Sequence, residues 1–264
     1  MVNENTAPAV LITIPLSHYC EKARWALDRV ALPYREEPHV PLLHRWATRR
    51  NGGTGVPLLV QGDRRWTDST DILVHADAFR GGGVLYPQDA ALRREVDRLE
   101  ELFDTQLGPN ARRFAYEHLL PDARLLRSLW SREAPGIETL LLPLIIPIAR
   151  RLIRSGYKVT PESAQRSLNK VRDVFGQVDR HLSDGRRFLV GDCFTAADLT
   201  FASLSAPVLF PAECRAVLPA LDAVPVAMRD EVLKCRDTMA GQFALRLYGA
   251  ERGRTMSTVD IEAS

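Results

Sequence analysis

A glycine-rich break at residues 78–89 divides this sequence into two parts with different patterns. The break holds three consecutive glycines and a proline, a composition typical of a linker. Before it, short β-branched runs alternate with helical patterns, whereas the apolar patterns after it have helical spacing. The chain has 264 residues, the length of one large domain or two ordinary ones. We therefore predict an α/β domain over residues 1–80 and an all-α domain over residues 89–250.

The first part contains strand and helix signals in a definite order. A β-branched run over 10–14 predicts a buried strand, and helical spacing over 17–30 predicts a helix after it. Residues 33–38 predict a second extended segment, and residues 56–66 predict a β-hairpin around a Gln-Gly-Asp turn. A further helix begins at residue 68. The predicted order is strand, helix, strand, hairpin and helix.

The second part carries long helical patterns with clear start signals. Thr160, followed by a proline, supplies an N-cap and a favourable first turn for a helix of alternating three- and four-residue apolar steps. Thr195 and Asp198 form an acidic variant of the capping box, which predicts another helix start. Apolar positions over 228–243 predict one last long helix.

The longest apolar run, Leu140 to Ala149, contains two prolines and precedes a basic cluster. The cluster consists of Arg150, Arg151, Arg154 and Lys158. A membrane-spanning helix needs about 20 apolar residues, so the run is too short to be one. One interpretation is a kinked, buried helix or an ordered loop; the other is a segment that rests on a membrane surface. We expect the first, and no membrane partner.

Charge and cysteine content exclude other classes of protein. The chain has 35 Lys and Arg against 33 Asp and Glu, a net charge of +2, so it lacks the excess positive charge that nucleic-acid binding requires. Its four cysteines are scattered and show no paired metal-ligand spacing. This pattern is typical of a reducing compartment. We expect a cytoplasmic protein without a metal site.

Ser17 and Cys20 lie at the junction between the first predicted strand and the first predicted helix. A helix N-terminus presents unpaired amides and a partial positive charge, which stabilise a nearby anion. Ser17 can be a plain N-cap, or its hydroxyl can donate a hydrogen bond to a bound thiolate. Cys20 can be a small buried hydrophobe or a nucleophile with a lowered pKa. The residues alone leave both pairs of interpretations open.

Two further positions allow more than one interpretation. Helix capping explains Asp68-Ser69, although exposed amides beside a hydroxyl and a carboxylate can also bind the charged groups of an amino acid. His44 and Arg45 lie in a segment that we expect to be a loop, where they meet a carboxylate or stay in solvent. The sequence contains no phosphate-binding loop, zinc-protease pattern or Ser/His/Asp order.

Four motifs in this order resemble the cytosolic glutathione S-transferases, and the resemblance spans both parts of the chain. Residues 17–27 (SHYCEKARWAL) resemble the family's active-site turn and first helix, and residues 56–59 (VPLL) resemble its V-P-x-L element, whose proline is cis. The Asp-Ser pair at 68–69 resembles the family's acidic-Ser pair, and residues 188–198 (FLVGDCFTAAD) resemble its helical-domain signature. The resemblance implies a thioredoxin-like domain followed by an all-α domain.

The resemblance also implies roles for individual residues. Ser17 matches the position at which serine-type members hold the hydroxyl that hydrogen-bonds the glutathione sulfur. Val56 matches the residue whose backbone pairs with the cysteinyl part of glutathione, so we expect that backbone to lie outside the sheet ladder. His44 lies near the position that contacts the glycine carboxylate. The implied glutathione-binding residues are Ser17, His44, Val56, Pro57, Asp68 and Ser69.

The main hypothesis is a glutathione transferase of the serine type. Ser17 is its catalytic residue and stabilises the thiolate of glutathione, the co-substrate, which attacks a hydrophobic small-molecule electrophile held by the helical domain. The resemblance also implies a homodimer. A second hypothesis is a glutathione-dependent thiol-disulfide reductase that uses Cys20. A third is a non-catalytic protein of the same fold that serves as a binding or scaffold module. The stretch 112–157 has no clear counterpart in compact members, so the electrophile stays unidentified.

Overall fold

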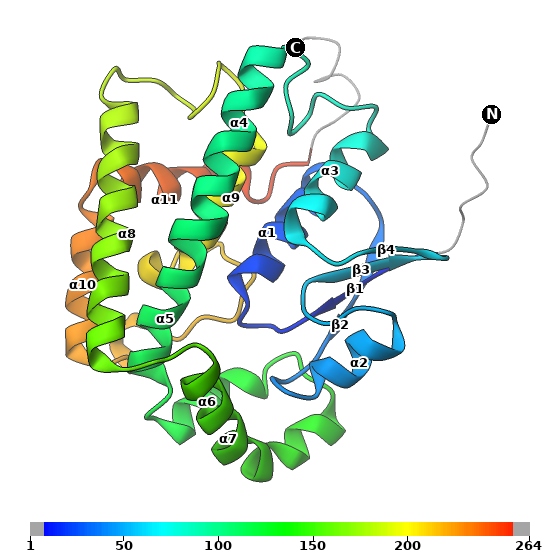
Figure 1. Cartoon of the computed structure of the whole chain (residues 1–264), viewed down its shortest axis with the longest axis vertical. Helices are drawn as coiled ribbons and strands as arrows, with labels where there is room; N and C mark the ends of the chain where they lie inside the picture. The colour runs from blue at the N-terminus through cyan, green and yellow to red at the C-terminus, as the bar shows by residue number, and fades with distance from the viewer. Residues whose placement is uncertain (1–7, 256–264) are drawn as a thin grey trace.

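The computed structural model describes residues 8–255, so the first seven residues of the predicted N-terminal domain lie outside the described part. In the first unit helices pack around a small sheet (Figure 1). Its elements are β1 (Ala9–Thr13), α1 (His18–Arg29), β2 (Tyr34–Pro38), α2 (His44–Arg50), β3 (Leu58–Gln61), β4 (Arg64–Trp66) and α3 (Ser69–Phe79). The predicted order is confirmed, except that α2 replaces the loop expected around His44. The N-cap of α2, Leu43, makes no side-chain cap hydrogen bond, so no start signal marks this helix in the sequence.

The four strands form one mixed sheet in the order β2-β1-β3-β4. β1 runs parallel to β2 and antiparallel to β3, and β3 and β4 form the predicted hairpin. Because successive side chains of a strand point to opposite faces, Leu11 and Leu59 join the core on the side of α1 and α3. Ile12 and Leu58 face the other way and pack with Ala47 of α2. Helices therefore cover both faces of the sheet.

The second unit is helical. Its elements are α4 (Ala90–Leu102), a π-helical turn (Phe103–Leu107), α5 (Gly108–Leu119), α6 (Ala123–Trp130), α7 (Gly136–Gly156), α8 (Pro161–Leu182), α9 (Ala196–Leu209), a 3₁₀ turn (Leu221–Ala223), α10 (Val226–Arg236) and α11 (Met239–Glu251). The single last helix predicted over 228–243 is wrong. The Oγ1 atom of Thr238 accepts a hydrogen bond from the amide of Gly241 at 2.9 Å, and this cap starts a new helix after α10 ends.

Helix α9 forms the centre of the second unit and is buried along its whole length. It packs against α1 of the first unit and against α4, α5 and α11 of the second. Its start confirms the predicted capping motif, because the Asp198 carboxylate accepts hydrogen bonds from the Thr195 amide (2.8 Å) and hydroxyl (2.9 Å). The amide of Leu189 donates to the same carboxylate at 2.8 Å. The family-like signature thus fixes the helix against which α1 rests.

Helix α7 carries the longest apolar run and is only half-buried. It stays helical through both of its prolines. Leu142 and Ile146 are buried in a core that α6 and α7 share, whereas Leu140 and Leu144 are 74% and 71% exposed. The interpretation as a buried helix is therefore correct for one face and wrong for the other. No helix within residues 8–255 is long and apolar enough to cross a membrane.

Candidate functional site

A cavity of about 410 Å³ lies between the two units. The first unit contributes the β1–α1 turn, the start of α2 and the loop before β3, and the second contributes α5, α7 and the segment after α9. Ser17, His44 and Val56, three of the residues predicted to form the site, line this cavity. The fold thus brings together side chains that are up to 39 positions apart in the sequence.

Ser17 is the N-cap of α1 and faces the cavity. Its Oγ accepts a hydrogen bond from the Cys20 amide at 3.3 Å, and its own amide donates to the carbonyl of Ile14 at 2.9 Å. These bonds hold the turn in place. The side chain combines a hydroxyl, which both donates and accepts, with the positive end of a twelve-residue helix.

Cys20 lies one turn later and points away from the cavity. Its side chain is fully buried, and it does not contribute to the cavity lining. Burial raises the pKa of the thiol, since a thiolate is costly in surroundings that exclude water. This environment favours the interpretation as a buried small hydrophobe.

Val56 and Pro57 are joined by a cis peptide bond, as predicted. Val56 lines the cavity. The ladder between β3 and β1 starts one position after the proline, at the pair Leu58 and Ile12. The backbone of Val56 therefore lies outside the β1–β3 ladder at the rim of the cavity, where an extended ligand can pair with it.

Asp68 and Ser69 lie at the start of α3, and neither forms part of the cavity lining. Asp68 is exposed and accepts a hydrogen bond from the Thr70 amide at 2.8 Å, which makes it the N-cap of α3. Ser69 is buried. The Nζ of Lys22 donates to the hydroxyl of Thr70 at 2.9 Å and so ties this helix start to α1.

His44 lines the cavity from the first residue of α2. Burial, followed by the nearby Arg45 charge, lowers its pKa to about 4, so its imidazole is neutral at neutral pH. Its Nδ1 is buried without a hydrogen-bond partner in the described part of the chain. Arg45 also lines the cavity and is the cation at this end that can meet a carboxylate.

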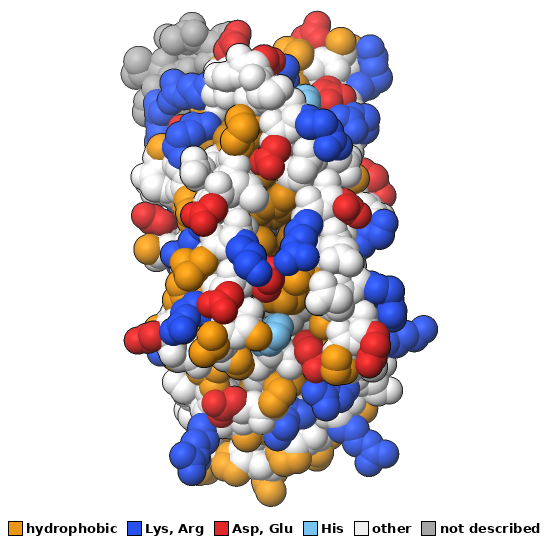
Figure 2. All heavy atoms as spheres, turned by 90° about the vertical axis from the view of Figure 1, so that its left-hand side faces the viewer, with side chains coloured by type: hydrophobic (Ala, Val, Ile, Leu, Met, Phe, Trp, Pro, Cys, Tyr) orange, Lys and Arg blue, Asp and Glu red, His pale blue; other side chains and the backbone are white. Residues whose placement is uncertain are grey.

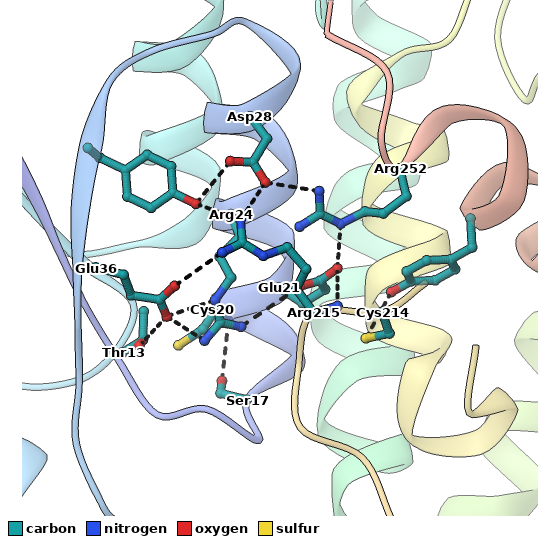
Figure 3. Close-up of polar contacts among 12 residues, drawn as sticks. Thr13, Ser17, Cys20, Glu21, Arg24, Asp28, Glu36, Cys214, Arg215 and Arg252 are labelled. Atoms are coloured by element: carbon teal, nitrogen blue, oxygen red, sulfur yellow. Dashed lines mark hydrogen bonds and ion pairs between the residues drawn. The ribbon is translucent and has the colours of Figure 1, made fainter. Parts of the chain in front are cut away.

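The back of α1 is held by a polar network, which we call the rear contact (Figure 3). Glu21 accepts from Arg252 at 2.6 Å, and Asp28 pairs with both Arg252 and Arg215 at 3.0 Å. Glu21 is fully buried and Arg252 is 5% exposed. The contact fixes α1, and with it the turn that carries Ser17, against the end of the helical unit.

A second polar connection, the front contact, joins α7 to the end of β2. The Nδ1 of His39 lies 2.5 Å from one carboxylate oxygen of Glu138. The other oxygen accepts from the amide of Val40 at 2.8 Å. The contact anchors the start of α7, whose later turns line the cavity.

The helical wall of the cavity contains residues that the sequence analysis missed, above all Arg112. Its guanidinium lies 4.2 Å from the ring centre of Tyr157 and 5.7 Å from that of Tyr19. Its Nε is buried without a hydrogen-bond partner within residues 8–255. Burial and this charge lower the pKa of His18 to about 3. In the sequence, only the helical spacing of positions 112, 115, 116 and 119 indicates that these cavity-lining residues of α5 lie on one face.

No group of three or more His, Cys, Asp or Glu side chains within residues 8–255 is arranged to hold a metal ion. The cavity instead combines hydroxyl, amide and guanidinium donors with apolar and aromatic walls. Such a set can bind a polar peptide with an anionic sulfur next to a hydrophobic molecule.

Comparison with known proteins agrees with this arrangement. Residues 11–82 match the family model of the glutathione S-transferase N-terminal domain, and residues 161–224 match that of the C-terminal domain. A search of curated proteins found no match. The two family models together cover just over half of the chain.

Solved structures show the same fold at low sequence identity. A glutathione transferase from Phanerochaete chrysosporium aligns with a TM-score of 0.61 at 13% identity, over 95% of this chain and 99% of its own. A beta-etherase from Sphingobium aligns with a TM-score of 0.59 at 15% identity, over 90% and 98%. A possible glutathione S-transferase from Rhodopseudomonas palustris aligns with a TM-score of 0.55 at 16% identity, over 96% and 97%. From its two domain matches and this shared fold, the chain belongs to the glutathione S-transferase family.

Proposed function

We propose that this protein is a glutathione transferase that joins the sulfur of glutathione to a hydrophobic electrophile in the cavity. The position of Ser17 carries the proposal, because its hydroxyl faces the cavity at the N-terminus of α1. In this proposal the sulfur of glutathione lies at Ser17, and its backbone pairs with that of Val56, the residue before Pro57. The glycine end points toward His44. The opposite end points toward Asp68 and Ser69. The apolar wall of α5 and α7 then holds the electrophile.

The reaction that we propose is a nucleophilic substitution or addition. The thiol of glutathione gives its proton to solvent, and the resulting thiolate forms a C–S bond. In a substitution the leaving group departs with its electron pair. In an addition the π electrons of the double bond move onto its activating group, and the resulting anion takes a proton from solvent. Ser17 stays protonated and donates a hydrogen bond to the sulfur. This bond and the helix field need to lower the thiol pKa by about one to two units.

Arg112 supports a further detail of the electrophile. A guanidinium in a largely apolar cavity, without a carboxylate partner in the described residues, is suited to an anionic group. We therefore propose an aromatic or aliphatic electrophile that carries a carboxylate or a similar anion. The aromatic rings of Tyr157 and Tyr19 beside the guanidinium fit the flat part of such a molecule.

The Ser17→Ala variant tests the catalytic role. We expect kcat/KM with a model aryl halide to fall about 10- to 100-fold at neutral pH, because the bound thiol returns toward its ordinary pKa. When the ultraviolet absorbance of the bound thiolate is followed against pH, the midpoint of its titration should move up by about one to two pH units. Thr238→Ala is the matched control, since it removes the cap of α11 far from the cavity. Equal kcat/KM and an unshifted thiolate titration in Ser17→Ala would contradict the role of Ser17.

The Arg112→Met variant tests the anionic group. With two aryl halides that differ only by a carboxylate, we expect about a tenfold or greater loss of kcat/KM for the charged substrate alone. A raised KM for glutathione with both substrates would instead show that Arg112 binds a carboxylate of glutathione.

The other hypotheses have less support. A reductase that uses Cys20 requires a reachable thiolate, whereas this thiol is buried and its pKa is raised. A non-catalytic scaffold predicts no saturable glutathione binding at millimolar concentration, which isothermal titration calorimetry measures directly. A homodimer and a cytoplasmic location stay predictions.

A further inference from the structure

Helix α7 presents a continuous apolar face to solvent, which we call the α7 stripe. The stripe consists of Ile137, Leu140, Leu141, Leu144, Ile148 and Leu152, which are 39–74% exposed. Their spacing of three, one, three, four and four residues places them on one side of the helix. Six of the fourteen exposed large hydrophobic side chains of residues 8–255 therefore belong to one helix face.

The stripe is a second apolar face in addition to the one that holds α7 in the fold. The opposite side of the helix, with Leu142, Ile146, Ala149 and Ile153, is buried in the core shared with α6. A helix at the surface of a globular unit needs only that one face to be apolar. An exposed apolar stripe of this size indicates a site at which a partner protein or a membrane binds.

Basic side chains surround the stripe. The segment 122–158, which holds α6 and α7, has seven Arg and Lys and three Asp and Glu, a net charge of +4. The whole chain nets only +2, so this segment is basic while the remainder is acidic. Of its three acidic groups, Glu138 is buried in the front contact with His39. Figure 2 shows hydrophobic side chains at the lower end of the molecule, where α6 and α7 lie, with Lys and Arg on both sides.

We propose that the α7 stripe docks this protein on the surface of an anionic lipid bilayer. An apolar helix face flanked by Arg and Lys is the pattern of a helix that lies in the membrane interface, with its cations at the lipid headgroups. Arg151 lies on the same side as Leu144 and Ile148, and Arg154 follows it. The proposal replaces the expectation, from the sequence, of no membrane partner.

A second copy of the chain is a less suitable occupant. A two-fold dimer through this face brings the same surface of both copies together, so each basic segment of net charge +4 faces its own duplicate. Repulsion between like charges opposes that contact, whereas anionic headgroups complement both the charge and the apolar face.

The stripe and the cavity meet at Leu152, which belongs to both. A hydrophobic molecule dissolved in the bilayer therefore reaches the cavity wall without crossing open water, if α7 lies on the membrane. The docking itself does not depend on the transferase activity.

Co-sedimentation with lipid vesicles tests the docking. We compare neutral vesicles of phosphatidylcholine with vesicles of equal parts phosphatidylcholine and phosphatidylglycerol. The full-length protein should bind the anionic vesicles at least tenfold more tightly, and added salt should weaken this binding. The double variant L144Q/I148Q should lose at least tenfold in affinity, because two apolar side chains no longer enter the interface. R151Q/R154Q should reduce the preference for anionic lipid.

The control double variant is V226Q/M239Q. These two side chains are 60% and 49% exposed on α10 and α11, away from α7, so the change should leave vesicle binding intact. Circular dichroism melting curves show whether each variant is folded. Absence of binding by the wild-type protein, or equal losses in the α7 and control variants, would overturn the proposal. So would a wild-type dimer that L144Q/I148Q converts to monomer without any binding to lipid.

Discussion

The rear and front contacts both join the helical unit to the thioredoxin-like unit, but through different kinds of interaction. In the rear contact Glu21 and Arg252 are almost completely removed from water and lie 2.6 Å apart. In the front contact the carboxylate of Glu138 binds the imidazole of His39 and one amide, and Glu37 lies 3.3 Å from the other imidazole nitrogen. The rear contact fixes the helix that carries Ser17, whereas the front contact fixes the helix that closes the cavity.

The two walls of this one cavity therefore differ in stability. A buried charge that loses its partner is far more costly than an amide or imidazole that loses one hydrogen bond. The Ser17 side of the cavity is therefore the more firmly held. The α7 side has Glu138 as its buried polar anchor and packs its apolar face against α6, while its contacts from Arg113 and Arg150 are exposed. It is therefore the wall that a single substitution loosens.

The largest effect is expected from Arg252→Met, which removes the cation of the rear contact. The carboxylate of Glu21 then stays buried without its main partner, and we expect the free energy of unfolding to fall by about 3–5 kcal/mol. Urea denaturation followed by circular dichroism measures this loss.

The matched control for that substitution is Arg187→Met. The side chain of Arg187 is 68% exposed and lies 3.9 Å from Glu251, so its removal should cost about 0–1 kcal/mol. Similar losses in the two variants would show that burial does not distinguish the rear contact from a surface ion pair.

A smaller effect is expected from Glu138→Gln, which weakens the front contact. The hydrogen bond to Glu138 raises the pKa of His39, so the folded state binds this proton more tightly than the unfolded state does. The stabilisation is complete below the unfolded pKa of about 6.5 and is lost as the pH rises through the raised pKa. At low pH we expect a loss of about 1.5–3 kcal/mol in the variant, and this difference should shrink as the pH rises.

Hydrogen exchange of the α7 amides, measured at several pH values, gives the local stability of this helix. Glu133→Gln changes the charge by the same amount at an exposed position just before α7 and should leave the exchange rates unchanged. Two results would show that the front contact does not anchor α7. One is a difference in exchange rate between Glu138→Gln and wild type that does not change with pH; the other is equally fast exchange in Glu138→Gln and Glu133→Gln.

The sequence predicts the elements of the thioredoxin-like unit well because its signals are local. Ser17 and Asp68 are capping residues recognisable from the residues directly after them, and the Val56-Pro57 element lies within one short segment. In this unit the spacing of a few neighbouring apolar side chains is enough to distinguish strands from helices. Only α2 lacks such a signal, and it is the element that the sequence analysis misses in this unit.

The helical wall depends on contacts between distant residues, so the sequence predicts it poorly. Arg112 and Tyr157 are 45 positions apart and meet only because α5 and α7 pack beside one cavity. The pair Glu21 and Arg252 is separated by 231 positions. The apolar run of α7 gives no sign of which face the core takes, since both of its faces are apolar.

The smallest effect is expected from Cys20→Ala, and it separates the two candidate residues of the active-site turn. Cys20 is fully buried and faces away from the cavity lining, so its loss removes one packed sulfur atom and costs about 1 kcal/mol of stability. The conjugation rate should stay within about twofold of wild type, because the hydroxyl of Ser17, which we propose stabilises the thiolate, is intact. Steady-state kinetics with glutathione and an aryl halide measure this. A loss of conjugation in Cys20→Ala comparable to that in Ser17→Ala would mean that the sulfur of Cys20 takes part in the chemistry, and that the α1 turn opens far more than its rear contact permits.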